Sequence, residues 1–232
     1  MNDASLRLLV VGAGRMGQAI AEEARSRGHT VVGVLDRSAS LTALPHGVAD
    51  CAIEFTVPTA AESVCLQLVS RGLPVVSGTT GWSEGLERVQ AAVRADGGAF
   101  VHSANYAIGV QLLLRGAAAL AAAFAGQLGF DAVITETHHA RKLDAPSGTA
   151  RLLQDAARAQ DATRSYPITS VRLGHVPGTH ELQYDGAFEQ ITLRHEVRDR
   201  RIFAVGAVTA AERLTGRTGV VTFADLLFGE QA

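Results

Sequence analysis

The first hundred residues alternate between short, mostly apolar runs and amphipathic stretches. The runs have the length and hydrophobicity of strands buried on both faces, and they cover residues 6–11, 30–35, 51–56, 74–77 and 99–101. Between the first two runs, Met16, Ile20 and Ala24 recur every fourth residue, as in a helix packed on a sheet. Residues 59–71 and 83–94 show similar helical spacing. Strands that alternate with helices through short links predict an α/β fold with a parallel, doubly wound sheet.

The pattern changes after residue 106. Residues 108–125 are apolar on nearly every side, which predicts a helix buried between layers. Shorter strand-like runs follow, at 131–135, 168–172, 181–184 and 189–195. In the last run apolar and polar residues alternate strictly, as in an open sheet with one covered face. Residues 202–213 are predicted to be a helix and 219–227 a closing segment. We therefore expect a second, smaller α+β domain with an open mixed sheet.

Composition and charge are those of an ordinary soluble globular protein. The chain has 232 residues, 47% hydrophobic and 19% charged, with a formal net charge of −2 that gives no reason to expect nucleic acid or a membrane as a partner. Cys51 and Cys65 are too few for a disulfide framework or a zinc site, so we expect buried, reduced thiols and no metal. The N-terminus runs directly into a predicted strand, without a visible signal peptide. The expected location is the cytoplasm.

A glycine-rich motif joins the first predicted strand to the first predicted helix. It consists of Gly12, Ala13, Gly14, Arg15, Met16 and Gly17. Gly12 would allow the tight turn, Gly14 the approach of a pyrophosphate, and Gly17 the contact of helix and strand. An acid, Asp36, follows about twenty residues beyond the glycines. Strand, glycine turn, helix, strand and acid together predict a Rossmann domain that binds NADH or NADPH.

The end of the second strand leaves the choice of cofactor open. Asp36 could accept hydrogen bonds from both hydroxyls of the adenosine ribose, which favours NAD. Arg37 beside it could pair with a 2′-phosphate, which favours NADP, or could be a solvated arginine at a strand end.

Three more loops lie at the carboxyl ends of predicted strands, where doubly wound sheets bind their ligands. They contain the candidate cofactor-binding residues Phe55 and Thr56, then Gly78, Thr79 and Thr80, and finally Ser103, Ala104, Asn105 and Tyr106. Each loop taken singly could be only a turn, but the loops agree on one edge of the sheet.

A polar stretch from Glu136 to Ala150 joins a predicted strand to a predicted helix. Ser147 is a good N-cap, and the amides of Gly148 and Thr149 would point outward at the positive end of the helix. With the charge of Lys142 nearby, this predicts a site for a carboxylate or phosphate, with His138 or His139 within reach as a proton donor. The alternative is a loop of solvated charges followed by ordinary helix capping.

The spacing Glu136-x-His138-x-x-x-Lys142-x-Asp144-x-Pro-Ser-Gly-Thr-Ala resembles the signature of the 4-hydroxy-tetrahydrodipicolinate reductase family. The resemblance extends from Leu8 to Leu227. It implies reduction by NADH or NADPH of 4-hydroxy-tetrahydrodipicolinate, which yields a cyclic imine dicarboxylate by loss of water, in lysine and diaminopimelate biosynthesis. His138 is our candidate for the proton donor because imidazole titrates near neutral pH. Lys142 would anchor a carboxylate and assist proton transfer.

The resemblance also implies roles for residues outside the signature. His139, Gly148 and Thr149 would bind the substrate. Gly78, Thr80, Ala104, Asn105 and Tyr106 match segments that line the nicotinamide in the family. The C-terminal segment of about 210–232 would return to complete the dinucleotide-binding domain of residues 1–106, and residues 107–209 would bind substrate and form a homotetramer through their sheet.

The sequence departs from the family pattern at two positions. Arg15 directly follows Gly14, where long family members have an additional glycine, and this puts the phosphate contacts in doubt. Val133 stands where the family often has glutamate. A weaker match at 170–180 suggests that Gly178 and His180 border the substrate pocket, although a hairpin with surface histidines fits as well.

Two other functions remain open. Another two-domain NAD(P)-dependent dehydrogenase, such as an aspartate or homoserine dehydrogenase, would not require Lys142 ahead of the Pro-Ser-Gly-Thr segment. A dinucleotide-binding redox sensor without turnover would keep Gly12 to Gly17 but would not need His138 and Lys142.

Overall fold

The computed structural model describes residues 5–229. Contacts divide this part of the chain into two compact units. The first contains the residues up to Ala107 together with those from Arg201 onward, and the second contains Ile108–Arg200.

The first unit is built on a parallel sheet. Its strands are β1 (Arg7–Val11), β2 (Thr30–Leu35), β3 (Cys51–Glu54), β4 (Val75–Ser77), β5 (Ala99–His102) and β10 (Gly219–Val221). They lie in the order β10-β5-β4-β3-β1-β2, and all neighbours are parallel. The order reverses at β1, whose neighbours are β2 and β3. This confirms the predicted doubly wound sheet.

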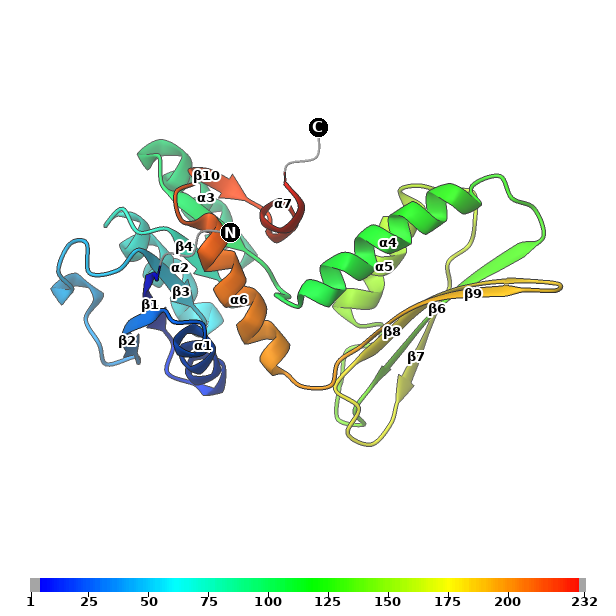
Figure 1. Ribbon diagram of the computed structural model, residues 1–232, viewed down its shortest axis with the longest axis horizontal. Coiled ribbons are helices and arrows are strands. Elements are labelled where there is room, and N and C mark those ends of the chain that lie inside the picture. The colour runs from blue at the N-terminus through cyan, green and yellow to red at the C-terminus, as the bar shows by residue number, and fades with distance from the viewer. Residues whose placement is uncertain (1–4, 230–232) are drawn as a thin grey trace. The chain divides into compact units, whose positions relative to one another are not determined.

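Helices cover both faces of this sheet (Figure 1). They are α1 (Arg15–Ser26), α2 (Pro58–Val69), α3 (Ser83–Asp96), α6 (Arg201–Leu214) and the short α7 (Phe223–Phe228), with a 3₁₀ turn η1 at Leu41–Ala43. One core cluster joins Leu9, Val75 and Phe100 of the strands to residues of α2 and α3. Because side chains alternate along a strand, Leu8, Val10 and Ile53 point to the opposite face, where α1 and α6 pack on each other. Cys51 and Cys65 are buried free thiols, as expected.

The chain returns to the first unit earlier than the sequence suggested. The expected point was near residue 210, whereas the whole of α6, from Arg201, belongs to the first unit. Close packing explains this position: a Cβ on Gly206 would lie 1.6 Å from the carbonyl oxygen of Tyr106. An ion pair of 3.1 Å between Arg27 and Glu212 also ties α6 to α1. An apolar helical pattern predicts a covered helix but does not indicate which of the two sheets α6 packs on.

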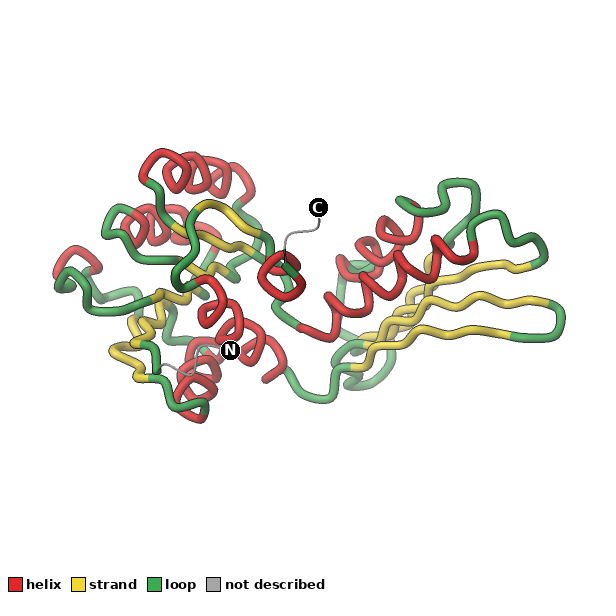
Figure 2. Tube along the Cα trace, turned by 45° about the horizontal axis from the view of Figure 1, so that its top comes forward, coloured by secondary structure: helices red, strands yellow, loops and turns green. Residues whose placement is uncertain are grey.

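The second unit contains a mixed sheet and two helices (Figure 2). Its strands are β6 (Phe130–His138), β7 (Ile168–Arg172), β8 (Thr179–Gly186) and β9 (Gln190–Glu196), in the order β7-β6-β8-β9. The β6–β7 pair is parallel and the other two pairs are antiparallel. Helices α4 (Ile108–Phe124) and α5 (Gly148–Arg158) lie side by side on one face of the sheet (Figure 1). The predicted α+β unit with an open mixed sheet is confirmed.

The covered face of the sheet changes from apolar to polar along β6. Ala132 and Ile134 pack with Leu182, Tyr184 and both helices, and the rings of Phe124 and Tyr184 stack with centroids 4.2 Å apart. The next residues on the same face, Glu136 and His138, are also buried. Two buried titratable groups, Glu136 and His138, thus lie at the polar end of a mostly apolar face.

Helix α4 is less enclosed than its composition predicted. Leu113, Ala117 and Ala121 are buried against the sheet, but Leu112 is 54% exposed on the other side of the helix. That outer side consists mostly of alanines, which are good helix formers and carry little apolar surface. None of the helices described is both long and apolar enough to cross a membrane.

Candidate active site

The glycine motif forms a close-packed turn at the start of α1. Gly12 has φ +116°, and a Cβ there would lie 2.0 Å from the carbonyl oxygen of Phe55. A Cβ on Gly17 would lie 1.7 Å from the carbonyl oxygen of Gly12. Gly14 is different: it is the exposed N-cap of α1, with nothing within 4 Å of its Cβ position. The turn therefore fits a dinucleotide, since it leaves open space at the helix end where a pyrophosphate binds.

The loops after β1 and β3 are neighbours at the point where strand order reverses. Gly12 touches the main chain of Phe55, and Gly78 touches its ring, because a Cβ on Gly78 would lie 2.1 Å from Phe55 Cζ. Phe55 and Thr56 are partly buried, Thr79 is buried and Thr80 is exposed. The loops after β1, β3 and β4 thus meet at one edge of the sheet.

The loop after β5 is held by its own hydrogen bonds. Asn105 Oδ1 accepts from the Ala107 amide at 2.9 Å, and Ser103 Oγ donates to the carbonyl of Asn105 at 2.9 Å. The hydroxyl of Tyr106 donates to the carbonyl oxygen of Ser77 at 2.9 Å, and the side chain is 2% exposed. The Tyr106 ring therefore belongs to the core, which leaves its main chain for contact with a cofactor, whereas Ala104 is exposed.

Asp36 and Arg37 follow β2 and are both exposed. The amide and hydroxyl of Ser38 donate to Asp36 Oδ1 at 2.9 and 2.6 Å, and these bonds lower the pKa of the Asp36 carboxyl. The ionised acid can accept from ribose hydroxyls, while Arg37 beside it can meet a phosphate, so both cofactors still fit.

The sequence predicted no role for one buried acid in this unit. Glu54, the last residue of β3, lies within a run that reads as a plain buried strand. Its carboxylate accepts hydrogen bonds from four side chains, those of Thr56, Cys65, Ser77 and Thr79. The partners follow 2, 11, 23 and 25 residues later in the chain, so a local pattern could indicate Thr56 but not the other three.

In the second unit, a buried acid and a buried imidazole share the covered face of β6. Glu136 Oε2 is hydrogen-bonded to Nδ1 of His138, and Glu136 Oε1 accepts from Arg172 Nη2 at 2.8 Å. Burial alone would raise the pKa of Glu136, but hydrogen bonds from Arg172, Ser170 and His138 lower it to about 2. Glu136 is thus ionised at neutral pH.

The ionised acid fixes the tautomer of His138. A carboxylate can only accept, so Nδ1 of the ring carries the shared hydrogen, and in the neutral ring Nε2 keeps its lone pair. Burial lowers the pKa of His138 below its ordinary value, although the Glu136 carboxylate opposes this effect. Gly178 leaves room for the ring, since a Cβ there would lie 3.1 Å from Nε2. The ring also meets His180 edge to face, with centroids 5.1 Å apart.

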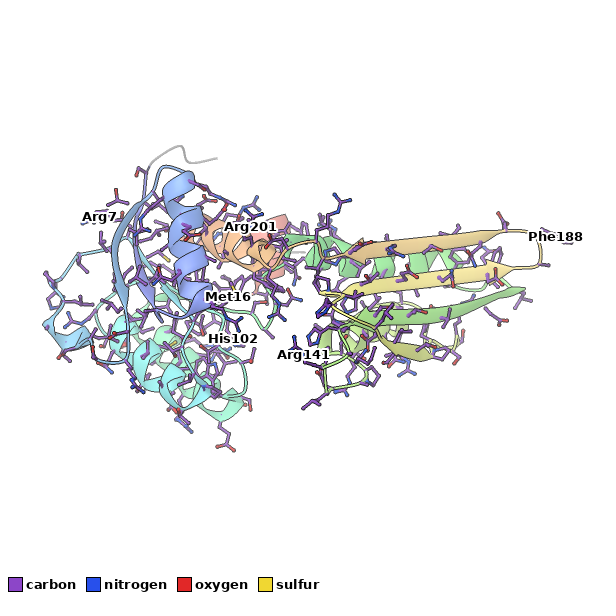
Figure 3. The ribbon with its side chains drawn as sticks, turned by 90° about the horizontal axis from the view of Figure 1, so that it is seen from below. Arg7, Met16, His102, Arg141, Phe188 and Arg201 are labelled. Atoms are coloured by element: carbon purple, nitrogen blue, oxygen red, sulfur yellow. The ribbon has the colours of Figure 1, made fainter. Side chains whose placement is uncertain are left out.

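The loop between β6 and α5 is attached to Arg172. This guanidinium donates to the carbonyl oxygens of Lys142, at 3.3 Å, and Asp144, at 2.6 Å. The loop lies at one end of the sheet, with Arg141 at its surface, and Phe188 marks the hairpin at the other end (Figure 3). Lys142 Nζ forms an ion pair with Asp144 at 2.7 Å. The lysine that the sequence predicted to bind an anion is thus paired with a carboxylate of its own loop.

The N-terminus of α5 completes this cluster. Ser147 is the N-cap, and its Oγ accepts from the Ala150 amide at 3.2 Å, as predicted. The same oxygen is 3.1 Å from Nε2 of His180. Gly148 is exposed, with nothing within 4 Å of its Cβ position, and Thr149 is partly buried. His180 therefore connects the helix end to His138, whereas the sequence suggested only that His180 borders the substrate pocket.

Two ring nitrogens of the cluster are buried without a hydrogen-bond partner within residues 5–229. They are Nδ1 of His139 and Nδ1 of His180. Burial also lowers the pKa of His180 to about 4, so this ring is neutral at pH 7. Unmatched polar atoms at a cluster of this kind suit a polar ligand.

No metal was expected, yet Glu136, His138 and His180 place potential ligand atoms within 4.8 Å of one another. Their hydrogen bonds account for this grouping without an ion, because Arg172 and His138 already occupy the two carboxylate oxygens of Glu136.

Comparison with known proteins covers nearly the whole chain. Residues 6–106 match the family model described as dihydrodipicolinate reductase, N-terminus, and residues 109–227 match that of the C-terminus. A 4-hydroxy-tetrahydrodipicolinate reductase of Christiangramia forsetii is 34% identical over 233 residues, which span 96% of this chain and 98% of that protein. The same enzyme of Acidiphilium cryptum is 38% identical over 237 residues, 94% of this chain and 95% of that protein.

Solved structures agree on the fold. The dipicolinate-bound dihydrodipicolinate reductase of Paenisporosarcina sp. TG-14 superposes with a TM-score of 0.77 at 22% identity, over 94% of this chain and 98% of that one. GenD2 from gentamicin A biosynthesis, in complex with NAD, gives a TM-score of 0.60 at 14% identity, over 96% of this chain and 90% of that one. With two family models matched end to end, this chain belongs to the dihydrodipicolinate reductase family.

Proposed function

We propose that this chain catalyses the reduction of 4-hydroxy-tetrahydrodipicolinate to tetrahydrodipicolinate, with loss of water, in lysine and diaminopimelate biosynthesis. As a member of its family, it is an NAD(P)H-dependent oxidoreductase. The observation that carries the proposed residue roles is the buried Glu136–His138 pair next to the capped end of α5.

The first unit would hold the cofactor through the loops at the edge where strand order reverses. The pyrophosphate would lie at Gly12 to Gly17, the ribose at Asp36 and Arg37, and the nicotinamide near Phe55, Thr56, the 78–80 loop and the 103–106 loop. When bound, the reduced nicotinamide supplies a hydride. The residues of the first unit bind and orient it.

His138 would supply the proton that must accompany the hydride. At neutral pH the ring is mostly neutral, with Nδ1–H directed at Glu136, so only the imidazolium form can donate from Nε2. Glu136 is a fixed negative charge that stabilises this imidazolium. The ring must therefore take up a proton before each turnover, and Glu136 makes that uptake easier.

The substrate's carboxylates would bind at the start of α5. The amides of Gly148 and Thr149 lie at the positive end of the helix, and His139 presents a buried ring nitrogen that lacks a partner in the described chain. Lys142 would turn from Asp144 toward a carboxylate. It is the single lysine among the chain's 21 lysines and arginines, and lysine, unlike arginine, can give up a proton.

We also infer a cytoplasmic homotetramer in which the open sheet of the second unit forms the contact. The face of β8 and β9 away from the helices carries Gln183, Thr192 and Arg194, which hydrogen-bond within the sheet or with the neighbouring strand. Light scattering at micromolar concentration tests this assembly, and a monomer would rule it out.

The test of the reaction is consumption of NADH and NADPH with freshly made product of the preceding synthase. His138→Gln and Lys142→Met should each lower kcat at least a hundredfold while leaving the cofactor dissociation constant within threefold. His175→Gln, at an exposed histidine in a neighbouring loop, is the matched control and should behave as wild type. Near-normal turnover in either site variant would refute the role assigned to that residue.

Cofactor choice has its own test, a paired titration of NADH and NADPH with and without Arg37→Ala. If Arg37 meets a 2′-phosphate, the variant should lose affinity for NADPH alone. If it is only a solvated side chain, both affinities should stay unchanged.

A further inference from the structure

Glu54 is a fully buried acid without a cationic partner. Its exposure is 0%, and within residues 5–229 no lysine, arginine or histidine forms an ion pair with it. Removing a carboxylate from water is costly unless its oxygens are well hydrogen-bonded. An acid kept under these conditions, in a strand that is otherwise apolar, calls for a functional explanation.

Hydrogen-bond donors from two loops converge on this carboxylate. Oε1 accepts from the amide of Thr56 at 2.8 Å, from the hydroxyl of Thr56 at 2.5 Å and from the hydroxyl of Thr79 at 2.5 Å. Oε2 accepts from the hydroxyl of Ser77 at 2.6 Å and from the thiol of Cys65 in α2 at 4.0 Å. The amide of Thr56 is also 2.8 Å from Thr79 Oγ1. One side chain thus ties together the loops that follow β3 and β4.

These bonds determine what the two threonines can offer to a ligand. Each hydroxyl hydrogen points inward at Glu54, so each oxygen can only accept from outside. Thr79 Oγ1 already accepts from the Thr56 amide, whereas Thr56 is partly exposed and keeps lone pairs for another donor. Since Phe55 fills the space beside Gly78, neither loop can shift without the other.

We propose that Glu54 is a positioning residue for the reduced dinucleotide. It aligns the 55–56 and 78–80 loops and fixes Thr56 Oγ1 as an acceptor for an N–H or O–H group of the cofactor, such as the amide hydrogens of the nicotinamide. This inference rests on the proposed cofactor site and adds to it a residue that does not touch the cofactor.

The test measures cofactor binding directly, with the full chain. Trp82 is the single tryptophan, and its indole donates to the carbonyl of Thr79 at 2.7 Å, so its fluorescence reports on this loop. Titrations with NADH and NADPH give dissociation constants for the wild type, Glu54→Gln, Glu54→Leu and Glu54→Asp. Ser77→Ala is the control, because Ser77 binds Glu54 without belonging to either loop. Urea unfolding checks that each variant is folded.

Glu54→Leu should raise the cofactor dissociation constant and KM at least tenfold, with a smaller change in kcat. Glu54→Gln should stay within threefold, because its amide oxygen can accept from the threonines while its NH₂ donates to Ser77. Ser77→Ala should also stay within threefold. If Glu54→Leu does not fold, Glu54→Asp decides, since its shorter side chain withdraws from Thr79 and should raise the dissociation constant at least fivefold.

A folded Glu54→Leu with wild-type affinity would overturn the inference, as would equal losses in the Gln and Leu variants. Where Glu54→Asp has to decide, wild-type affinity in that variant would overturn it as well. Failure of the wild type to bind either cofactor would instead refute the proposed function.

Discussion

Among single residues, Gly178 shows how missing volume can define a site. Its hydrogen side chain leaves the space that the ring of His138 occupies, with Nε2 3.1 Å from where a Cβ would be. That separation is tighter than ordinary van der Waals contact, and His138 cannot move freely because its other nitrogen is bonded to Glu136.

Gly178→Ala should therefore lower kcat/KM at least tenfold and cost about 2–3 kcal/mol of folding stability, because the added Cβ is crowded and Gly178 has φ +157°, which L residues rarely adopt. Initial rates and urea unfolding measure the two effects. Gly116→Ala in α4 is the control. Its Cβ would also be crowded, 3.2 Å from a side-chain carbon of Leu193, but it would not contact His138. Unchanged kcat/KM in Gly178→Ala would show that the ring tolerates displacement.

His180 makes a second prediction at this scale, concerning stability in acid. Its folded pKa is about 4 and its ordinary value is 6.5, because burial disfavours the charged ring. The unfolded chain therefore binds the proton first, and stability is lost as pH falls from about 6.5 toward 4. At about 1.4 kcal/mol per pKa unit, the loss from this residue is about 3 kcal/mol at most.

His180→Gln should remove this part of the acid sensitivity. The free energy of unfolding in urea, measured from pH 7.5 to pH 4, should fall less steeply in the variant than in the wild type. Parallel curves would mean that His180 is not the group that titrates.

Glu54 and Glu136 show what single-residue reading could and could not predict. The sequence placed His138, Lys142 and Ser147 in one loop because their spacing is local. It treated Glu54 as part of an apolar strand and gave Glu136 no partner, since Thr79 and Arg172 lie 25 and 36 residues away in the chain. Hydrogen bonds across a sheet depend on strand order, which no local pattern contains.

At the scale of elements, helix α5 joins capping and chemistry in one residue. Ser147 caps the helix through its Oγ and contacts His180 with the same atom. The cap of α7 is comparable in geometry: Thr222 Oγ1 accepts from the Asp225 amide at 3.1 Å, within a capping box. Only the first cap lies in the candidate site.

Ser147→Ala and Thr222→Ala should each cost about 1 kcal/mol of stability, the usual effect of losing a cap. Ser147→Ala should in addition raise the KM for the dicarboxylate at least fivefold, because the end of α5 would no longer be held against His180. Unfolding curves and substrate titrations compare the two variants. Equal KM values would show that α5 contributes only structure.

Elements were predicted well where burial and periodicity agree and poorly where small residues dominate. The apolar runs of β1, β3 and β4 are short strands buried on both faces, and the pattern identified each of them. The alanines of α4 read as a fully buried helix, but one side is exposed. Alanine is compatible with both environments, so its presence alone does not place a helix face.

On the scale of the whole molecule, the first unit is discontinuous and the second is not. The core of the second unit is formed by residues between Leu113 and Leu193. The first unit depends on α6 and β10, which arrive after the second unit in the chain and cover one sheet face and the edge of β5. The sequence did predict that the C-terminal segment returns, although it placed the return about ten residues late.

Residues 108–200 expressed alone should fold, whereas residues 1–107 alone should not. The 108–200 fragment keeps its whole core, whereas the 1–107 fragment lacks the edge strand β10 and the covering helix α6. Circular dichroism and cooperative urea unfolding would distinguish these outcomes. Joining 1–107 to 201–232 through a short glycine-serine linker should restore folding, and failure of that fusion would contradict the division into units.

Because the first unit is discontinuous, it is completed on the ribosome after the second unit, although its first residues are made earlier. During synthesis the second unit is complete once residue 200 has emerged, so it can fold at that point. The first hundred residues cannot complete their unit until the residues from Arg201 onward have been added. A premature stop ahead of Gly219 would thus leave the second unit intact and disrupt the first, which is the unit proposed to bind NADH or NADPH.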